Sequence, residues 1–131
     1  MATITIVEGQ NERTANVPDD QRLVLAIEAQ GVNIGHRCGG NARCTTCRVE
    51  ILDGEPDTMT KAEFDILRTR GIYGQARLSC QLVADHDMRV RPLMTKETEG
   101  WPDTGATPDP TVQPDPQRFP KAQLESEAGA S

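Results

Sequence analysis

The sequence predicts an α+β fold for residues 1–94, and three observations carry that prediction. Stretches of alternating polar and apolar residues, typical of half-buried strands, occur at the start of the chain and again after a cysteine-rich segment. Two stretches with helix-start signals and apolar residues at helical spacing follow the strand patterns. Short strand patterns close the region. The predicted order is strand, strand, helix, loop, strand, helix, strand, strand.

Caps and turn residues place the individual elements. Asp19 or Asp20 is the expected N-cap of the first helix, and Gly31 supplies the residue that ends it. Thr60 and Glu63 form a candidate capping box before the second helix. The expected elements are strands over 3–8 and 14–17, a helix over 23–29, a strand over 47–52, a helix over 61–70, and strands over 77–83 and 86–91.

Residues 95–131 differ in composition from the predicted domain that precedes them. Six of the nine prolines lie in this segment, large apolar residues are few, and acidic residues exceed basic ones. Such a composition favours an extended or disordered acidic tail without a core of its own. Trp101 and Phe119 are its candidate anchors onto the domain.

Composition narrows the function classes. The net charge is −6, so the chain lacks the basic surface that nucleic acid requires. Aromatic residues make up only 3%, so an aliphatic core is expected. No apolar run approaches the ~18 residues of a membrane span, and the first residues lack the pattern of a signal peptide. We therefore expect a cytoplasmic protein, in which cysteines serve as metal ligands rather than disulfides.

The four cysteines are the most informative residues. Cys38, Cys44 and Cys47 share one short glycine-bearing segment, and Cys80 lies far along the chain, giving the spacing C-x5-C-x2-C-x32-C. This arrangement is typical of an iron–sulfur cluster held by four thiolates. A structural zinc site remains an alternative, although zinc usually takes two C-x2-C pairs. A Rieske centre is disfavoured, because it needs paired histidine ligands and the two histidines here lack that arrangement. A disulfide is disfavoured, because it needs an oxidising compartment.

Residues beside the cysteines are suited to tune a cluster. Four thiolates leave it negatively charged, and reduction adds to that charge, so hydrogen-bond donors and cations favour reduction. His36 either makes reduction depend on pH or bonds to the loop backbone. His86 is assigned no role. The remaining candidates are the amides of Gly39 and Gly40, the hydroxyls of Thr45 and Thr46, and the side chains of Arg43 and Arg37, of which Arg37 is the better candidate for a solvated group.

The runs from Cys38 to Cys47 and from Arg77 to Gln81 resemble the 2Fe–2S ferredoxins, and the resemblance covers residues 1 to about 92. Five residues separate the first two cysteines, as in the adrenodoxin and putidaredoxin branch. The resemblance implies a ferredoxin domain over residues 1–94 with a β-grasp fold, a mixed sheet with a helix packed across it. It also implies a 2Fe–2S cluster with Cys38 and Cys44 on one iron, and Cys47 and Cys80 on the other.

The family implies a flavoprotein reductase as electron donor and an oxygenase, such as a cytochrome P450, as acceptor. We expect a one-electron carrier rather than an enzyme, since no nucleophile–base pair or phosphate-binding loop is evident. A redox-sensing or cluster-assembly binding protein is the alternative, with the tail as contact arm, and an electron-input component of a larger enzyme is a third. Helix 61–70 carries Lys61, Arg68 and Arg70, whereas the adrenodoxin branch presents an acidic helix to its partners there. The sequence therefore does not identify the redox partners.

Overall fold

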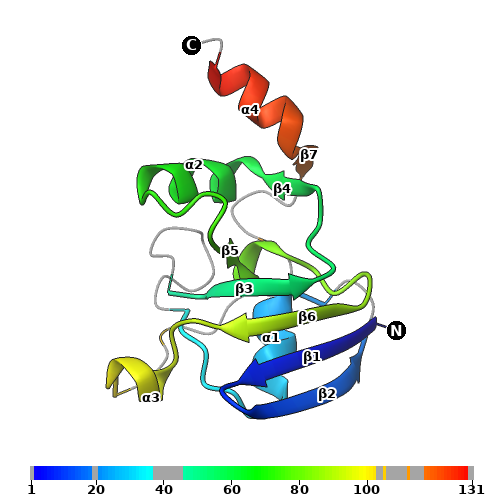
Figure 1. Ribbon diagram of the computed structural model, residues 1–131, viewed down its shortest axis with the longest axis vertical. Coiled ribbons are helices and arrows are strands. Elements are labelled where there is room, and N and C mark those ends of the chain that lie inside the picture. The colour runs from blue at the N-terminus through cyan, green and yellow to red at the C-terminus, as the bar shows by residue number, and fades with distance from the viewer. Residues whose placement is uncertain are drawn as a thin grey trace.

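A five-stranded mixed sheet forms the centre of the computed structural model, which describes residues 2–18, 21–36, 46–102, 105, 112 and 117–129 (Figure 1). The strand order is β2-β1-β6-β3-β5. Strands β1 and β2 form an antiparallel hairpin, β1 runs parallel to β6, and β3 runs antiparallel to both β6 and β5. The strands are β1 (Ala2–Glu8), β2 (Asn11–Val17), β3 (Arg48–Asp53), β5 (Arg77–Leu78) and β6 (Met88–Pro92).

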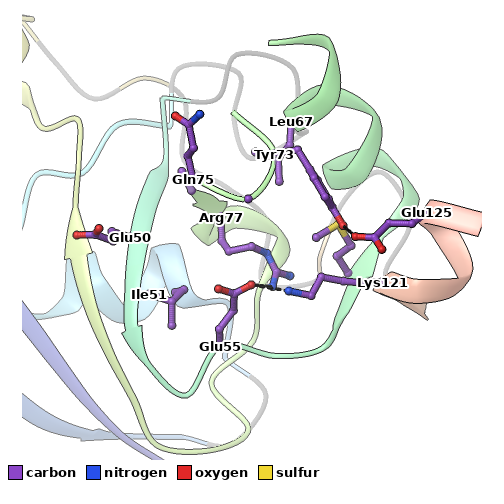
Figure 2. Close-up of a pocket in the computed structure, with 12 residues that line it drawn as sticks. Glu50, Ile51, Glu55, Leu67, Tyr73, Gln75, Arg77, Lys121 and Glu125 are labelled. Atoms are coloured by element: carbon purple, nitrogen blue, oxygen red, sulfur yellow. Dashed lines mark hydrogen bonds and ion pairs between the residues drawn. The ribbon is translucent and has the colours of Figure 1, made fainter. Parts of the chain in front are cut away.

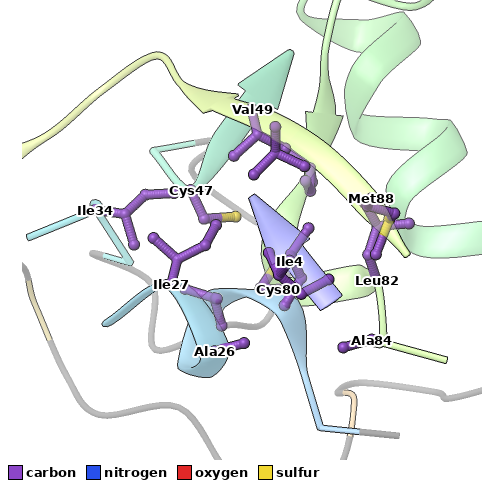
Figure 3. Packing of buried hydrophobic residues seen from close by; sticks show 14 of the residues in the cluster. Ile4, Ala26, Ile27, Ile34, Cys47, Val49, Cys80, Leu82, Ala84 and Met88 are labelled. Carbon is purple, nitrogen blue, oxygen red and sulfur yellow. The ribbon is translucent and has the colours of Figure 1, made fainter. Parts of the chain in front are cut away.

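Helix α1 (Leu23–Ala29) packs across one face of this sheet (Figure 1). Its buried residues Leu23, Val24, Ala26 and Ile27 join Ile4 and other strand residues in one aliphatic core (Figure 3). The expected buried helix is therefore confirmed. The other helical elements are α2 (Lys61–Thr69), the 3-10 turn η1 (Ser79–Gln81) and α3 (Lys96–Glu99).

One expected feature of the helices is confirmed, one is confirmed in half, and one is corrected. Gly31 has φ +86° just beyond the end of α1, a conformation that glycine adopts without strain. The Thr60 hydroxyl accepts a hydrogen bond from the Glu63 amide at 3.2 Å, as an N-cap does, but the Glu63 carboxylate bonds to Arg77 and the Leu78 amide instead of completing the capping box. The N-cap of α1 is Arg22 without a side-chain cap, rather than Asp19 or Asp20, which lie outside the described residues.

The strand expected over 77–83 is much shorter than the sequence pattern suggests. Strand β5 ends at Leu78, and the chain turns into η1. The Ser79 amide and hydroxyl both donate to the carbonyl oxygen of Cys47, at 3.1 and 2.7 Å, which draws the chain out of the strand. The alternation of apolar residues is thus met here by a buried turn as well as by a strand, so the pattern alone overestimates the length of the strand.

Residues 118–129 differ from the extended tail that the composition favours. Strand β7 (Arg118–Pro120) pairs antiparallel with β4 (Thr58–Thr60), and helix α4 (Lys121–Gly129) follows it (Figure 1). The physical reason is that β4 offers an edge for pairing, and the core accepts Leu124, which is only 2% exposed. Phe119 packs against the same core, as expected of an anchor.

Within the described part of the chain, none of the helices has the length and apolar character needed to cross a membrane.

Candidate iron–sulfur site

The fold brings two of the four predicted ligands to one place. Cys47 directly precedes β3, and Cys80 lies in η1 directly after β5, the strand that pairs with β3 through Arg48 and Leu78. Both cysteines are buried, at 2% and 0% exposure, in the hydrophobic cluster drawn in Figure 3. The Ser79 bonds to the Cys47 carbonyl fix the two ligand-bearing segments side by side.

The other two predicted ligands, Cys38 and Cys44, lie outside the described residues. The same holds for the predicted tuning residues Arg37, Gly39, Gly40, Arg43 and Thr45. Among the residues that the structure does describe, no three His, Cys, Asp or Glu side chains gather into a metal-binding group. The full ligand set therefore remains a prediction from the sequence.

The segment that carries the first cysteines begins and ends at one closely packed junction. A methyl group built on Gly35 would lie 2.7 Å from the Thr46 carbonyl oxygen and 2.7 Å from the Trp101 ring. These distances are shorter than van der Waals contact, so only glycine fits at this position. Trp101, expected as an anchor of the tail, thus packs where the cysteine segment leaves and rejoins the domain.

His36 lies beside this junction and is 3% exposed. Its Nε2 pairs with a carboxylate oxygen of Glu28 on α1. The sequence offered bonding to the loop backbone or pH-dependent tuning. The Glu28 contact is a further one, and both alternatives stay predictions. A carboxylate on the preceding helix could not be assigned as its partner from spacing alone.

Arg22 is a site residue that the sequence analysis missed. Its side chain is fully buried, and its Nε and Nη2 donate to the Cys80 carbonyl oxygen at 3.0 and 2.5 Å. The guanidinium therefore holds the backbone of the isolated fourth cysteine from the N-terminus of α1. Arg22 follows the polar run 19–21 directly before the apolar helix, so no signal in the sequence indicated that its side chain is buried.

Glu63 and Arg77 form a second buried contact that positions Cys80. Arg77 Nε donates to Glu63 Oε2 at 2.8 Å, and the same oxygen accepts from the Leu78 amide at 2.9 Å. Burial alone lowers the pKa of Arg77, but the attraction and hydrogen bonds of Glu63 and Glu55 raise it overall. Arg77 thus keeps its charge, and its contact with Glu63 fixes β5, the strand that delivers Cys80.

Gln81 is buried at 0% exposure, and its Nε2 donates to the Sγ of Cys80 at 3.6 Å. An iron–sulfur cluster requires cysteine sulfurs as ligands and is tuned by hydrogen bonds to them. Two buried thiols on adjacent segments, one of which accepts a side-chain N–H, meet both conditions. The described half of the site therefore fits the predicted cofactor.

The C-terminal segment borders a cavity beside β5. The cavity has a volume of about 320 Å³ and is lined by residues of β3, of the α2–β5 connection and of α4 (Figure 2). Lys121 pairs with Glu55 at 2.6 Å, and the Tyr73 hydroxyl donates to Glu125 at 2.5 Å. These contacts join α4 to the domain.

Known proteins support the iron–sulfur interpretation. The family described as a 2Fe-2S iron-sulfur cluster binding domain matches residues 5–85. Terpredoxin of a Pseudomonas species is 34% identical over 91 residues, which cover 65% of this chain and 86% of terpredoxin. This match supports the adrenodoxin and putidaredoxin branch.

Two further relatives extend the comparison. One component chain of the Na(+)-translocating NADH-quinone reductase of Methylococcus capsulatus is 30% identical over 79 residues, or 60% of this chain, but the match spans only 19% of that component. The ISC-like 2Fe-2S ferredoxin FdxB of Pseudomonas putida matches with a TM-score of 0.58 and 25% identity, covering 70% of this chain and 91% of its own. The mixed sheet, the buried thiols and these matches together show that the chain belongs to the 2Fe–2S ferredoxin family.

Proposed function

We propose that this protein is a one-electron carrier in which Cys38, Cys44, Cys47 and Cys80 hold the 2Fe–2S cluster. The observation that carries the proposal is the burial of Cys47 and Cys80 on two hydrogen-bonded segments within a domain of this family. When bound, such a cluster supplies one-electron exchange at low potential.

The described residues support the carrier by holding the ligands rather than by reacting. Arg22 and Ser79 fix the backbone of Cys80 and Cys47, so little rearrangement is needed when the charge of the site changes. The aliphatic core around both sulfurs excludes water from this side of the site. We place no catalytic group in the chain, so it acts as a component of an oxidoreductase system.

We further propose a cytoplasmic location, a flavoprotein reductase as donor, and a cytochrome P450 or another oxygenase as acceptor. The family resemblance supports this pairing. Docking for electron transfer is brief and partly electrostatic, and transfer rates should therefore fall as salt is added.

A second candidate function is electron input within a larger reductase. The match to the NADH-quinone reductase component favours it, because there the matched segment is only 19% of a longer reductase chain. A carrier accepts electrons from a separate flavoprotein and passes them on in multiple turnovers. An input module instead forms a stable complex with its acceptor.

The test starts from anaerobically purified protein. We expect about two iron and two sulfide per chain and, after dithionite reduction, the paramagnetic resonance signal of a reduced 2Fe–2S centre. Reduction by NADH through a ferredoxin reductase, followed by electron transfer to cytochrome c, then tests the carrier role. Zinc without sulfide would refute the cofactor assignment, whereas a loaded protein that no reductase reduces would refute the carrier.

A further inference from the structure

The buried side chain of Gln81 donates a hydrogen bond to the predicted ligand Cys80. The Nε2 to Sγ distance is 3.6 Å, and the Gln81 side chain has no exposure to solvent. A donor aimed at a cluster thiolate interacts more strongly after reduction, because reduction adds negative charge to the site.

Thr60 fixes which end of the Gln81 amide faces the sulfur. The Thr60 hydroxyl donates to Gln81 Oε1 at 2.5 Å and accepts from the Glu63 amide at 3.2 Å. Since the hydroxyl donates its one proton to the Gln81 oxygen, the NH₂ group is the end of the amide that is left for Cys80. Thr60 is only 1% exposed, and as the N-cap of α2 it has little freedom to reorient.

We propose that Gln81 raises the reduction potential of the cluster and that Thr60 acts as its positioning residue. This inference rests on the proposed function, since it requires Cys80 to be a cluster ligand. It also means that the N-terminus of α2 is connected to the cluster through two side-chain hydrogen bonds, Thr60 to Gln81 and Gln81 to Cys80.

The decisive variant is Gln81→Met, which keeps the volume of the side chain and removes the donor. We expect full iron and sulfide content, with the equilibrium constant for reduction lowered about three- to tenfold, where tenfold corresponds to about 59 mV for one electron. The Fe–S(Cys) stretching bands in the resonance Raman spectrum should also shift, because one thiolate loses its donor. A purely structural role for Gln81 would change stability and leave those bands in place.

Thr60 provides a second, independent measurement. Thr60→Val removes the hydroxyl at nearly constant shape, and Thr60→Ser retains it as the matched control. The valine variant should have a lower potential than the serine variant at equal cluster content. If Gln81→Met fails to retain its cluster, this pair decides the matter, and equal potentials in both variants would overturn the inference.

The two proposals fail in different ways. Unchanged potential and unchanged Raman bands in a fully loaded Gln81→Met protein would overturn the role of Gln81 and leave the carrier intact. Wild-type protein without inorganic sulfide would instead overturn the proposed function itself.

Discussion

Glu63 on α2 and Arg77 on β5 form an ion pair inside the domain, with 0% and 4% of their side chains exposed. The Arg77 Nε to Glu63 Oε2 distance is 2.8 Å, and Arg77 Nη2 lies 3.1 Å from Glu63 Oε1, so the contact is bidentate. Glu63 also receives the Leu78 amide, two residues before Cys80. The pair therefore connects the stability of the domain to the position of the fourth ligand.

Removing one charge of this pair should destabilise the protein severely. Glu63→Gln leaves the buried Arg77 charge with only the partly exposed Glu55 carboxylate, 3.5 Å away, and breaking a buried pair typically costs about 3–5 kcal/mol. Urea unfolding monitored by circular dichroism measures this loss. Asp65→Asn on the same helix is the matched control, because its partner Lys61 is 60% exposed and such pairs contribute about 0.5 kcal/mol or less. Equal losses in both variants would contradict the assigned role of the buried pair.

An added methyl group at Gly35 should destabilise the junction between this residue, Thr46 and Trp101. Gly35→Ala inserts a methyl group against the Thr46 carbonyl and the Trp101 ring, and such overpacking typically costs about 1–3 kcal/mol. We expect reduced cluster content, measured as iron and sulfide per chain. Gly9→Ala is the control for the added methyl group, because nothing lies within 4 Å of it. Its φ of +60° adds a backbone cost to stability but should leave the cluster content full. Full cluster content in Gly35→Ala would show that the junction tolerates expansion.

Replacing the fourth ligand tests the proposed ligand set directly. Cys80→Ser exchanges the thiolate for a hydroxyl at nearly the same volume, so folding should survive while one iron loses its sulfur ligand. We expect a loss of cluster content and of the visible absorption bands. Ser126→Ala, at an exposed position on α4, is the control and should keep its cluster. Undiminished iron, spectrum and stability in Cys80→Ser would refute Cys80 as a ligand.

The C-terminal segment should detach without loss of the cluster. Leu124→Ala removes a buried side chain, a change that typically costs about 2–5 kcal/mol. In the described part of the chain, β7 and α4 contact β4 and the cavity rim, so we expect faster amide exchange at Arg118 and Phe119 with cluster content unchanged. Gln123→Ala, on the exposed side of α4, is the control. Loss of the cluster in Leu124→Ala would make the segment part of the site.

The sequence predicted the hairpin, the buried helix and the ligand-bearing strand because each follows from local periodicity and caps. It failed where long-range contacts decide the structure. Strand β5 ends early because Ser79 bonds to Cys47, and residues 118–120 become a strand because β4 offers an unpaired edge. Likewise, Cys80 was identified from its type and spacing, whereas Arg22 and Gln81 become site residues only through side-chain contacts that no spacing encodes.

Tyr73, the only tyrosine of the chain, reports directly on the docking of α4. Burial and the hydrogen bond to Glu125 raise the pKa of Tyr73 from 10.0 to about 12. Between these pH values the folded protein keeps a proton that the unfolded chain has lost. The unfolded state then binds fewer protons, so stability falls as the pH rises through this window. The contacts of α4 should weaken over the same range.

The ultraviolet absorbance of the phenolate measures this titration without interference from another tyrosine. In Glu125→Gln we expect the midpoint to fall part of the way toward 10, because the carboxylate is lost while the burial remains. Leu124→Ala should also lower it, since detachment of α4 takes the Glu125 carboxylate away from the Tyr73 hydroxyl. Glu127→Gln, also on α4 and exposed, is the control and should leave the midpoint near that of the wild type. A midpoint near 10 in the wild-type protein would show that α4 does not cover Tyr73 in solution.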